Sequence, residues 1–217
     1  MPPIDSDAII IGAGISGMYQ LYRLRALGMH VQVLEAGTDV GGTWYWNRYP
    51  GARFDSESWS YGYSFSEELL QEWEWPEHFA AQPDTLRYLN YVAQKFDLKK
   101  HITFNARVTT AYFNDADNHW TVSVEGGAQY RAPLLITALG PLSAYTLPNI
   151  PGRDQFKGKA YHTARWPHDP VDMKGKRVGI IGTGATAIQT IQTIAKDVGH
   201  LTVFQRTPNW AAPLHNC

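Results

Sequence analysis

Two sets of small residues have the spacing G-x-G-x-x-G or G-x-G-x-x-A, which suits the binding of a dinucleotide. The sets are Gly12, Gly14 and Gly17, and Gly182, Gly184 and Ala187. In such a turn the first glycine permits a tight bend and the second lets the backbone approach a pyrophosphate, while the third small residue lets a helix pack close to a strand. The amino terminus of that helix offers N–H groups and a positive dipole to the phosphates. Each set therefore predicts a pyrophosphate site.

The residue that closes each pattern lies 23 positions after its first glycine: Glu35 in the first and Gln205 in the second. An acid at this place can accept hydrogen bonds from an adenosine ribose, so the first pattern predicts a dinucleotide with a free ribose. Gln205 is followed by Arg206 and Thr207, which can bind a 2′-phosphate that an acid would repel. The second pattern therefore predicts NADPH, although Arg206 alone is also compatible with a solvated surface charge. Two dinucleotides in one chain suggest electron exchange, usually between FAD and a nicotinamide cofactor.

Both patterns need a strand before the turn and a helix after it. Apolar runs and helical spacing predict these elements: strands at 8–11, 31–34, 177–181 and 201–204, and helices at 15–27 and 185–196. The same reasoning predicts a helix at 84–96 and strands at 102–108, 120–124 and 134–138, with residues 41–65 as loop.

The predicted fold class is α/β, with two Rossmann-type dinucleotide-binding domains of which the second is incomplete. We expect a FAD-binding domain at 1–147, a linker at 148–175 and the first βαβ unit of an NADPH-binding domain at 176–217. The exposed sheet edges of an incomplete domain are expected to favour association.

Charge and cysteine content exclude several classes of protein. The 19 Lys and Arg residues nearly balance 20 Asp and Glu, so we expect no nucleic-acid partner and no anionic membrane surface. The single cysteine, Cys217, allows no internal disulfide and no cysteine-based zinc cluster.

The uncharged stretch 132–152 contains four prolines, which favours a buried strand and a loop over a membrane span. The acidic amino terminus has no basic region typical of a secretory signal, so we expect a cytoplasmic protein.

A segment between the two patterns fits the motif F-x-G-x-x-x-H-x-x-x-W-P, with Phe156, Gly158, His162, Trp166 and Pro167 at its defined positions. It resembles the signature of type I Baeyer–Villiger monooxygenases. Flavin monooxygenases that oxidise nitrogen and sulfur have a similar motif without the Trp-Pro ending. The stretches 41–55 and 204–210 also resemble the Baeyer–Villiger family. Without that resemblance, His162 would be interpreted as a loop histidine with its hydrogen bonds satisfied, and Trp44 and Trp166 as core aromatics.

The resemblance implies roles for residues at matching positions. It implies that FAD is contacted by Ser16, Glu35, Gly42, Thr43, Trp44, Tyr45, Trp46, Tyr61 and Val108. It implies that NADPH is held by Gly182, Thr183, Gly184, Ala185, Thr186, Ala187, Ile188, Gln189, Arg206 and Thr207, with Arg53, Phe54 and Asp55 near the nicotinamide. Asp55 would be the acid that orients a catalytic arginine beside the flavin; the alternative is a helix cap for residues 56–60. The signature residues would control cofactor docking and domain motion.

The reaction that the resemblance implies is oxygen insertion into a ketone. NADPH would reduce FAD, O₂ would form a flavin C4a-peroxide, and attack on the ketone would release an ester or lactone. Family members are longer and carry their catalytic arginine downstream, so we expect this chain to be the amino-terminal portion, with that arginine outside it. Two alternatives are a flavin N- or S-monooxygenase and a truncated FAD-binding fragment with no activity of its own.

Overall fold

The computed structural model describes residues 4–213 and 215–216, so Cys217 lies outside the described residues. The chain divides into two compact units. Unit 1 comprises Met1–Tyr45 and Leu86–Ala144, and unit 2 comprises Trp46–Thr85 and Tyr145–Cys217. Within the described ranges, no helix has the length and apolar character needed to cross a membrane.

A parallel sheet forms the centre of unit 1, with the strand order β4-β3-β2-β8. Its strands are β2 (Ala8–Ile11), β3 (Val31–Leu34), β4 (Ile102–Thr103) and β8 (Leu134–Thr137). Ile10 pairs with Val33 on one side and with Ile136 on the other. Ile9 and Ile10 are fully buried. Such continuous apolar runs are typical of parallel strands that are covered on both faces.

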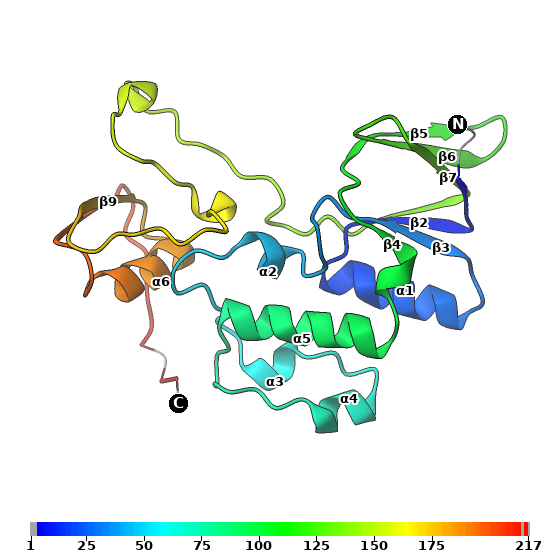
Figure 1. Cartoon of the computed structure of the whole chain (residues 1–217), viewed down its shortest axis with the longest axis horizontal. Coiled ribbons are helices and arrows are strands. Elements are labelled where there is room, and N and C mark those ends of the chain that lie inside the picture. Colours follow the sequence, from blue (N-terminus) through cyan, green and yellow to red (C-terminus); the bar gives the residue numbers. More distant parts are fainter. Residues whose placement is uncertain (1–3, 214, 217) are drawn as a thin grey trace. The chain divides into compact units, whose positions relative to one another are not determined.

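A second sheet and a helix cover the two faces of this parallel sheet (Figure 1). The second sheet has the order β1-β7-β6-β5 and is antiparallel except for β1. Its strands are β1 (Ile4–Asp5), β5 (Val108–Asn114), β6 (His119–Val124) and β7 (Gln129–Ala132). Val122 and Tyr130 of this sheet pack in one buried cluster with Ile9 and Leu34 of the parallel sheet. The opposite face receives α1 (Ile15–Ala26), whose Leu21 is fully buried.

Helix α5 (Gln82–Lys95) belongs to unit 1 from Leu86 onward. Its Pro83 lies at the start of the helix, where a missing N–H has no intrahelical partner to lose. After its end, the ring of Phe96 packs edge-on against Tyr22 of α1, with centroids 5.0 Å apart. The segment then continues through η1 (Lys99–His101) into β4.

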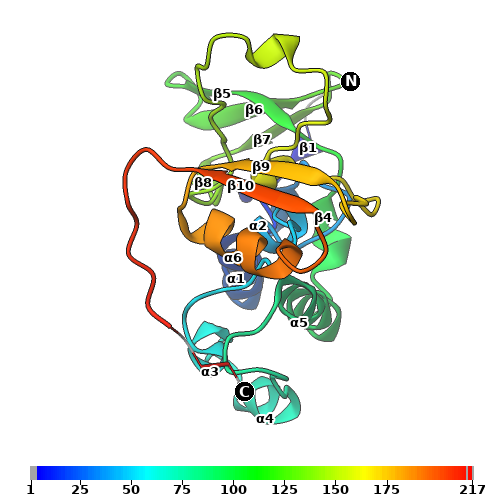
Figure 2. The same cartoon turned by 90° about the vertical axis from the view of Figure 1, so that its left-hand side faces the viewer.

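Unit 2 contains a smaller βαβ arrangement. Strands β9 (Arg177–Ile181) and β10 (His200–Phe204) are parallel and fully paired, and α6 (Ala185–Ile194) connects them. Figure 2 shows these two strands side by side. The unit also contains α3 (Ser58–Tyr61), α4 (Glu67–Glu72), η2 (Arg153–Gln155) and η3 (Thr163–Arg165). Helix α2 (Thr43–Trp46) lies where the chain passes from unit 1 to unit 2.

The α/β fold class and most predicted elements are confirmed, with boundaries that differ by at most two residues. The strand predicted at 102–108 is wrong: β4 ends at Thr103, Asn105 adopts a left-handed backbone with φ 56°, and β5 begins at Val108 in the other sheet. The chain changes sheets within that stretch. The loop predicted at 41–65 contains the short helices α2 and α3, and the reasoning from sequence missed β1, β5 beyond Val108, β7 and α4.

Candidate cofactor-binding sites

The two glycine patterns form turns with the same backbone frame. In the first, the Gly12 N–H donates to the carbonyl of Leu34, the last residue of β3, at 2.8 Å. In the second, the Gly182 N–H donates to Phe204, the last residue of β10, also at 2.8 Å. Gly12 has φ +104° and Gly182 has φ +105°, a region that side chains disfavour. The internal similarity predicted from spacing is therefore a similarity of structure.

The first turn is packed against its own protein on several sides. A Cβ at Gly12 would lie 2.6 Å from the carbonyl oxygen of Ala138, and one at Gly17 would collide with the carbonyl oxygen of Gly12. Gly14 is the N-cap of α1 and provides no side-chain cap. The amino terminus of this 12-residue helix therefore lies at the turn, where a pyrophosphate site requires it.

Glu35 lies immediately after β3, as the spacing predicts, and is only 4% exposed. Its Oε2 accepts the N–H of Ala13 at 2.7 Å and its Oε1 accepts the N–H of Gly37 at 2.7 Å. The carboxylate thus ties the end of β3 to the first glycine turn. Because each carboxylate oxygen has two lone pairs, both oxygens can still accept a ribose hydroxyl.

The aromatic stretch after β3 approaches the same turn through two glycines. Gly41 donates its N–H to the carbonyl of Ala13 at 3.0 Å. A Cβ on Gly42, which has φ +51°, would lie 2.7 Å from the Cα of Gly14. This contact brings one end of α2 beside the turn.

The predicted flavin contacts have different surroundings. Trp44 and Tyr45 are buried in the core of unit 1, and the Tyr45 hydroxyl lies 2.8 Å from the hydroxyl of Thr38. Val108 packs against the cluster between the two sheets. Trp46 and Tyr61 belong to unit 2, where Tyr61 stacks on Phe54 at 4.4 Å. Thr43 is half-buried and Ser16 is exposed. Their roles toward FAD stay predictions.

The second turn differs from the first in having open space around its glycines. Gly184 is the N-cap of α6, again without a side-chain cap, and a Cβ at Gly182 or Gly184 would meet no atom within 4 Å. Packing within the protein does not require glycine at position 184, whereas the close approach of a pyrophosphate does. The Gln205 Nε2 donates to the Thr183 hydroxyl at 3.0 Å, so the residue after β10 reaches back to the turn as Glu35 does in unit 1.

Arg206 and Thr207 follow β10 directly and are exposed. No side chain among the described residues forms an ion pair with Arg206, and its neighbour Gln205 is neutral. A free guanidinium in this place fits the predicted 2′-phosphate contact. The remaining predicted NADPH residues lie on the first two turns of α6: Ala185, Thr186, Ala187, Ile188 and Gln189.

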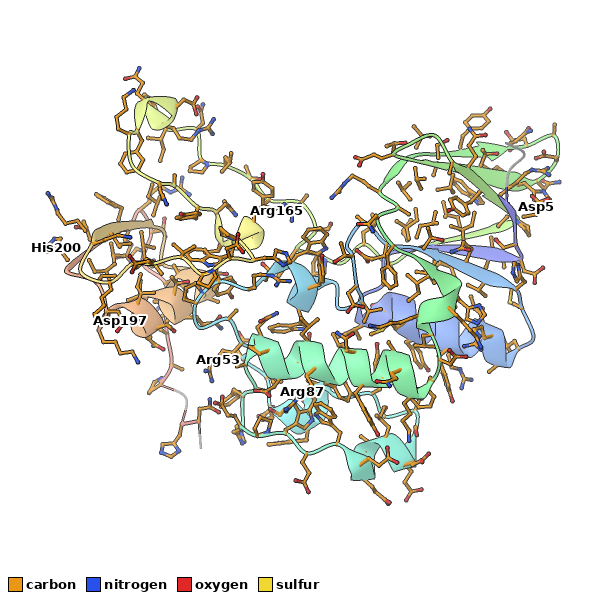
Figure 3. All side chains as sticks on the ribbon, in the orientation of Figure 1. Asp5, Arg53, Arg87, Arg165, Asp197 and His200 are labelled. Atoms are coloured by element: carbon orange, nitrogen blue, oxygen red, sulfur yellow. The ribbon has the colours of Figure 1, made fainter. Side chains whose placement is uncertain are left out.

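The segment 49–55 connects α2 to α3 and lies against α6. Arg53 belongs to this segment (Figure 3). The Arg53 guanidinium donates to Glu77 Oε2 at 2.8 Å and to the carbonyl of Phe79 at 3.1 Å. Asp55 is exposed, and the N-cap of α3 is Glu57. The interpretation of Asp55 as a helix cap is therefore wrong, and its role beside a flavin stays a prediction.

Sequence reasoning missed Tyr49, which donates to Gln189 at 2.8 Å. Burial raises the pKa of the Tyr49 phenol, and the Asp55 charge raises it further against a lowering hydrogen bond from Thr186. The phenol is therefore a neutral donor at ordinary pH. In the sequence, Tyr49 lies between two arginines and directly before a Pro-Gly turn. This local pattern does not indicate a contact with Gln189.

The signature segment contains a capped turn. His162 is the N-cap of η3, and its Nδ1 accepts the N–H of Ala164 at 3.1 Å, as expected for a loop histidine with a local partner. A Cβ at Gly158 would lie 2.6 Å from the ring of Phe156, an exposed side chain that could turn away. Trp166, with Pro167 after it, packs on Tyr161 at 5.4 Å.

Arg165 is a second residue that sequence reasoning missed. Its guanidinium lies over the rings of Trp46, at 5.2 Å, and Tyr145, at 4.9 Å (Figure 3). Residues 4–213 and 215–216 contain no group of three potential metal ligands.

Comparison with known proteins shows that the chain is similar to several monooxygenases. It is 50% identical over 216 residues to 2-oxo-Delta(3)-4,5,5-trimethylcyclopentenylacetyl-CoA monooxygenase of Pseudomonas putida, covering 97% of this chain and 40% of that protein. It is 45% identical to a Baeyer–Villiger monooxygenase of Pseudooceanicola batsensis, covering 98% and 39%. It is also 44% identical to the phenazine N-monooxygenase PhzNO1 of Lysobacter antibioticus, covering 95% and 38%.

Solved structures agree with these relatives. The structure of cyclohexanone monooxygenase from Rhodococcus sp. Phi1 bound to NADP⁺ matches with a TM-score of 0.96 and 44% identity, covering 99% of this chain and 40% of that one. The chain thus spans about 40% of the length of the relatives it matches. The profile of the pyridine nucleotide-disulphide oxidoreductases matches residues 9–216. The chain therefore belongs to the pyridine nucleotide-disulphide oxidoreductase family, and its predicted likeness to the amino-terminal portion of Baeyer–Villiger monooxygenases is confirmed.

Proposed function

We propose that this chain forms the FAD- and NADPH-binding portion of a flavoprotein monooxygenase that uses NADPH and O₂ to convert a ketone into an ester or lactone. The observation that carries the proposal is the pair of glycine turns with one backbone frame and different closing residues. One turn is closed by a buried carboxylate and the other by a neutral amide followed by a free arginine.

FAD fits the turn in unit 1. The amino terminus of α1 suits its pyrophosphate, and the two oxygens of Glu35 suit the hydroxyls of its ribose. Ala13 and Gly37 hold this carboxylate in place before any ligand arrives, which lowers the cost of ordering the site on binding. When bound, FAD would supply the redox chemistry by accepting hydride and reacting with O₂.

NADPH fits the turn in unit 2. The open space beside Gly184 admits a pyrophosphate at the amino terminus of α6, and Arg206 and Thr207 provide donors for a 2′-phosphate. Gln189 of α6 pairs with the backbone of Arg53, two residues before Asp55, whose carboxylate would orient an arginine. The domain boundaries and the cytoplasmic location expected from the sequence stay predictions.

A flavin N-monooxygenase is the second candidate, because a relative with that name is 44% identical over nearly the whole chain. The Trp166–Pro167 ending favours the Baeyer–Villiger reaction. The two reactions would use the oxygenated flavin differently. In the Baeyer–Villiger reaction it would attack the ketone as a nucleophile, whereas in N- or S-oxidation it would be the electrophile that the amine or sulfide attacks.

The test uses the purified chain with FAD, NADPH and O₂. We expect about one FAD per chain and loss of the oxidised-flavin absorbance on anaerobic addition of NADPH. In the complete protein, which supplies the arginine outside this chain, we expect lactone formation from cyclohexanone. Sulfoxide from methyl phenyl sulfide without any lactone would favour the second candidate. Bound FAD that NADPH cannot reduce would instead support a cofactor-binding fragment without activity of its own.

A further inference from the structure

Gln189 on α6 uses its side-chain amide as a partner for the backbone of a distant residue. Its Nε2 donates to the carbonyl of Arg53 at 3.0 Å, and its Oε1 accepts the N–H of Arg53 at 3.3 Å. One carboxamide thus pairs with both polar backbone groups of one residue, as a neighbouring antiparallel strand would. On its other side, Arg53 forms an isolated antiparallel bridge with Ala81. Gln189 therefore completes a short sheet-like arrangement.

The residues before Arg53 adapt the chain to this contact. The Tyr49 hydroxyl donates to the same Oε1 at 2.8 Å. Gly51 adopts φ +80°, and a Cβ there would lie 2.6 Å from the backbone carbonyl oxygen of Gln189 and would collide with the Thr193 hydroxyl. The turn therefore lies directly on the surface of α6, and the oxygen of the Gln189 amide receives two donors.

The next residues take their direction from this contact. The Arg53 guanidinium is held by Glu77 and Phe79, so it is not free to reach a ligand. Asp55 follows two positions later and is exposed. We propose that Gln189 is a positioning residue: it holds segment 53–55 on α6 and acts through Asp55, rather than by contacting NADPH itself. The catalytic part of this inference rests on the proposed function, whereas the positioning part does not.

The sharpest variant is Gln189→Glu, which keeps the size of the side chain but replaces the donor with an acceptor. An ionised Glu would face the Arg53 carbonyl with an oxygen, whereas a protonated Glu would again donate. The matched control is Gln192→Glu, because Gln192 is exposed on the same helix and undergoes the same change of charge. Tyr49→Phe is a milder variant that removes only one of the two donors to Oε1.

Hydrogen exchange of the peptide 49–55 measures positioning, with the peptide 185–194 as an internal reference for an intact helix. At pH 8 we expect Gln189→Glu to increase the exchange of 49–55 by about tenfold relative to the original chain. Gln192→Glu should change neither peptide, and Tyr49→Phe should produce a smaller increase. Equal exchange in the two Glu variants would overturn the inference.

Flavin reduction by NADPH measures the consequence for the site. We expect Gln189→Glu to lower the rate at saturating NADPH by about tenfold at pH 8, with the KM for NADPH within twofold. A large rise in KM with unchanged exchange would make Gln189 a ligand contact and overturn its positioning role. If the original chain is not reduced by NADPH at all, the proposed function fails, and the exchange result alone decides the positioning role.

Discussion

At the scale of single residues, the Glu35 carboxylate accepts one backbone N–H on each oxygen, from Ala13 and from Gly37. Both donors are buried with it, so the residue belongs to the structure of the turn as much as to a ligand site. An amide in its place would direct an NH₂ group against one of the two N–H donors. One buried donor would then lack an acceptor.

We expect Glu35→Gln to reduce the free energy of unfolding by about 1–3 kcal/mol, the range for an unsatisfied buried donor. The variant should also lose bound FAD. Urea denaturation and the ratio of flavin to protein absorbance measure the two effects. The control is Glu125→Gln, because the exposed pair of Glu125 with Arg107 at 3.6 Å should contribute little. A Glu35 variant as stable as the Glu125 variant would contradict the structural role.

Arg206 carries the predicted preference between the two nicotinamide cofactors. Arg206→Ala should weaken NADPH binding by about tenfold or more, because a charge-assisted contact with the 2′-phosphate is lost, and leave NADH binding nearly unchanged. Titration of both cofactors gives the two dissociation constants. Arg177→Ala is the control, since Arg177 lies at the opposite end of the two paired strands and has the same charge. Equal losses for NADPH and NADH would remove the 2′-phosphate assignment.

At the scale of elements, the two βαβ turns share one frame and differ in what surrounds them. The first is enclosed by the end of β8, by α1 and by the start of α2, whereas the glycines of the second face open space. The same substitution should therefore have opposite consequences in the two turns.

Gly184→Ala should leave the melting temperature within about 2 °C of the original value, because its φ of −70° suits alanine and its Cβ meets no protein atom. NADPH binding should nevertheless weaken by about tenfold or more, since the methyl group occupies the space of a pyrophosphate. Gly14→Ala, at the equivalent position of the first turn, should instead lower the melting temperature, because its Cβ would lie 3.3 Å from the Cα of Gly42 and would press on that backbone. Thermal unfolding followed by NADPH titration separates the two cases. Unchanged NADPH affinity in Gly184→Ala would show that no ligand approaches there.

The elements around both turns could be predicted because their residues are close in sequence and their apolar runs are simple. The 23-residue spacing also placed Glu35 and Gln205 correctly beside their turns. The crossing of 102–108 from one sheet to the other could not be predicted, because alternating apolar and polar residues do not record which sheet their strand joins. The pairing of Gln189 with Arg53 spans 136 residues, and periodicity within one element does not reveal such a contact.

At the scale of the whole molecule, the chain spans about 40% of its relatives and contains a two-stranded sheet with exposed apolar residues. In that sheet Ile181 is 65% exposed and Phe204 is 57% exposed. Exposed strands with apolar side chains are templates for pairing with other chains.

We expect the purified chain to self-associate as its concentration rises, and Val203→Lys on β10 to reduce this association, because a charged lysine disfavours pairing between strands. Sedimentation velocity at several concentrations measures the effect. Leu27→Lys is the control: Leu27 is also exposed but follows α1 and lies on no strand. A monomer at every concentration, or an equal effect of both variants, would contradict the expectation.

The guanidinium of Arg165 joins three stretches of chain that are distant in sequence. Trp46 and Tyr145, whose rings it contacts, are the first residues of unit 2 after the chain leaves unit 1 on two separate occasions. If η3 rotated, Trp46 and Tyr145 would have to move with it. Otherwise Arg165 would lose both ring contacts, each worth about 0.5–2 kcal/mol. We therefore expect the signature turn to move together with both places where the chain enters this unit.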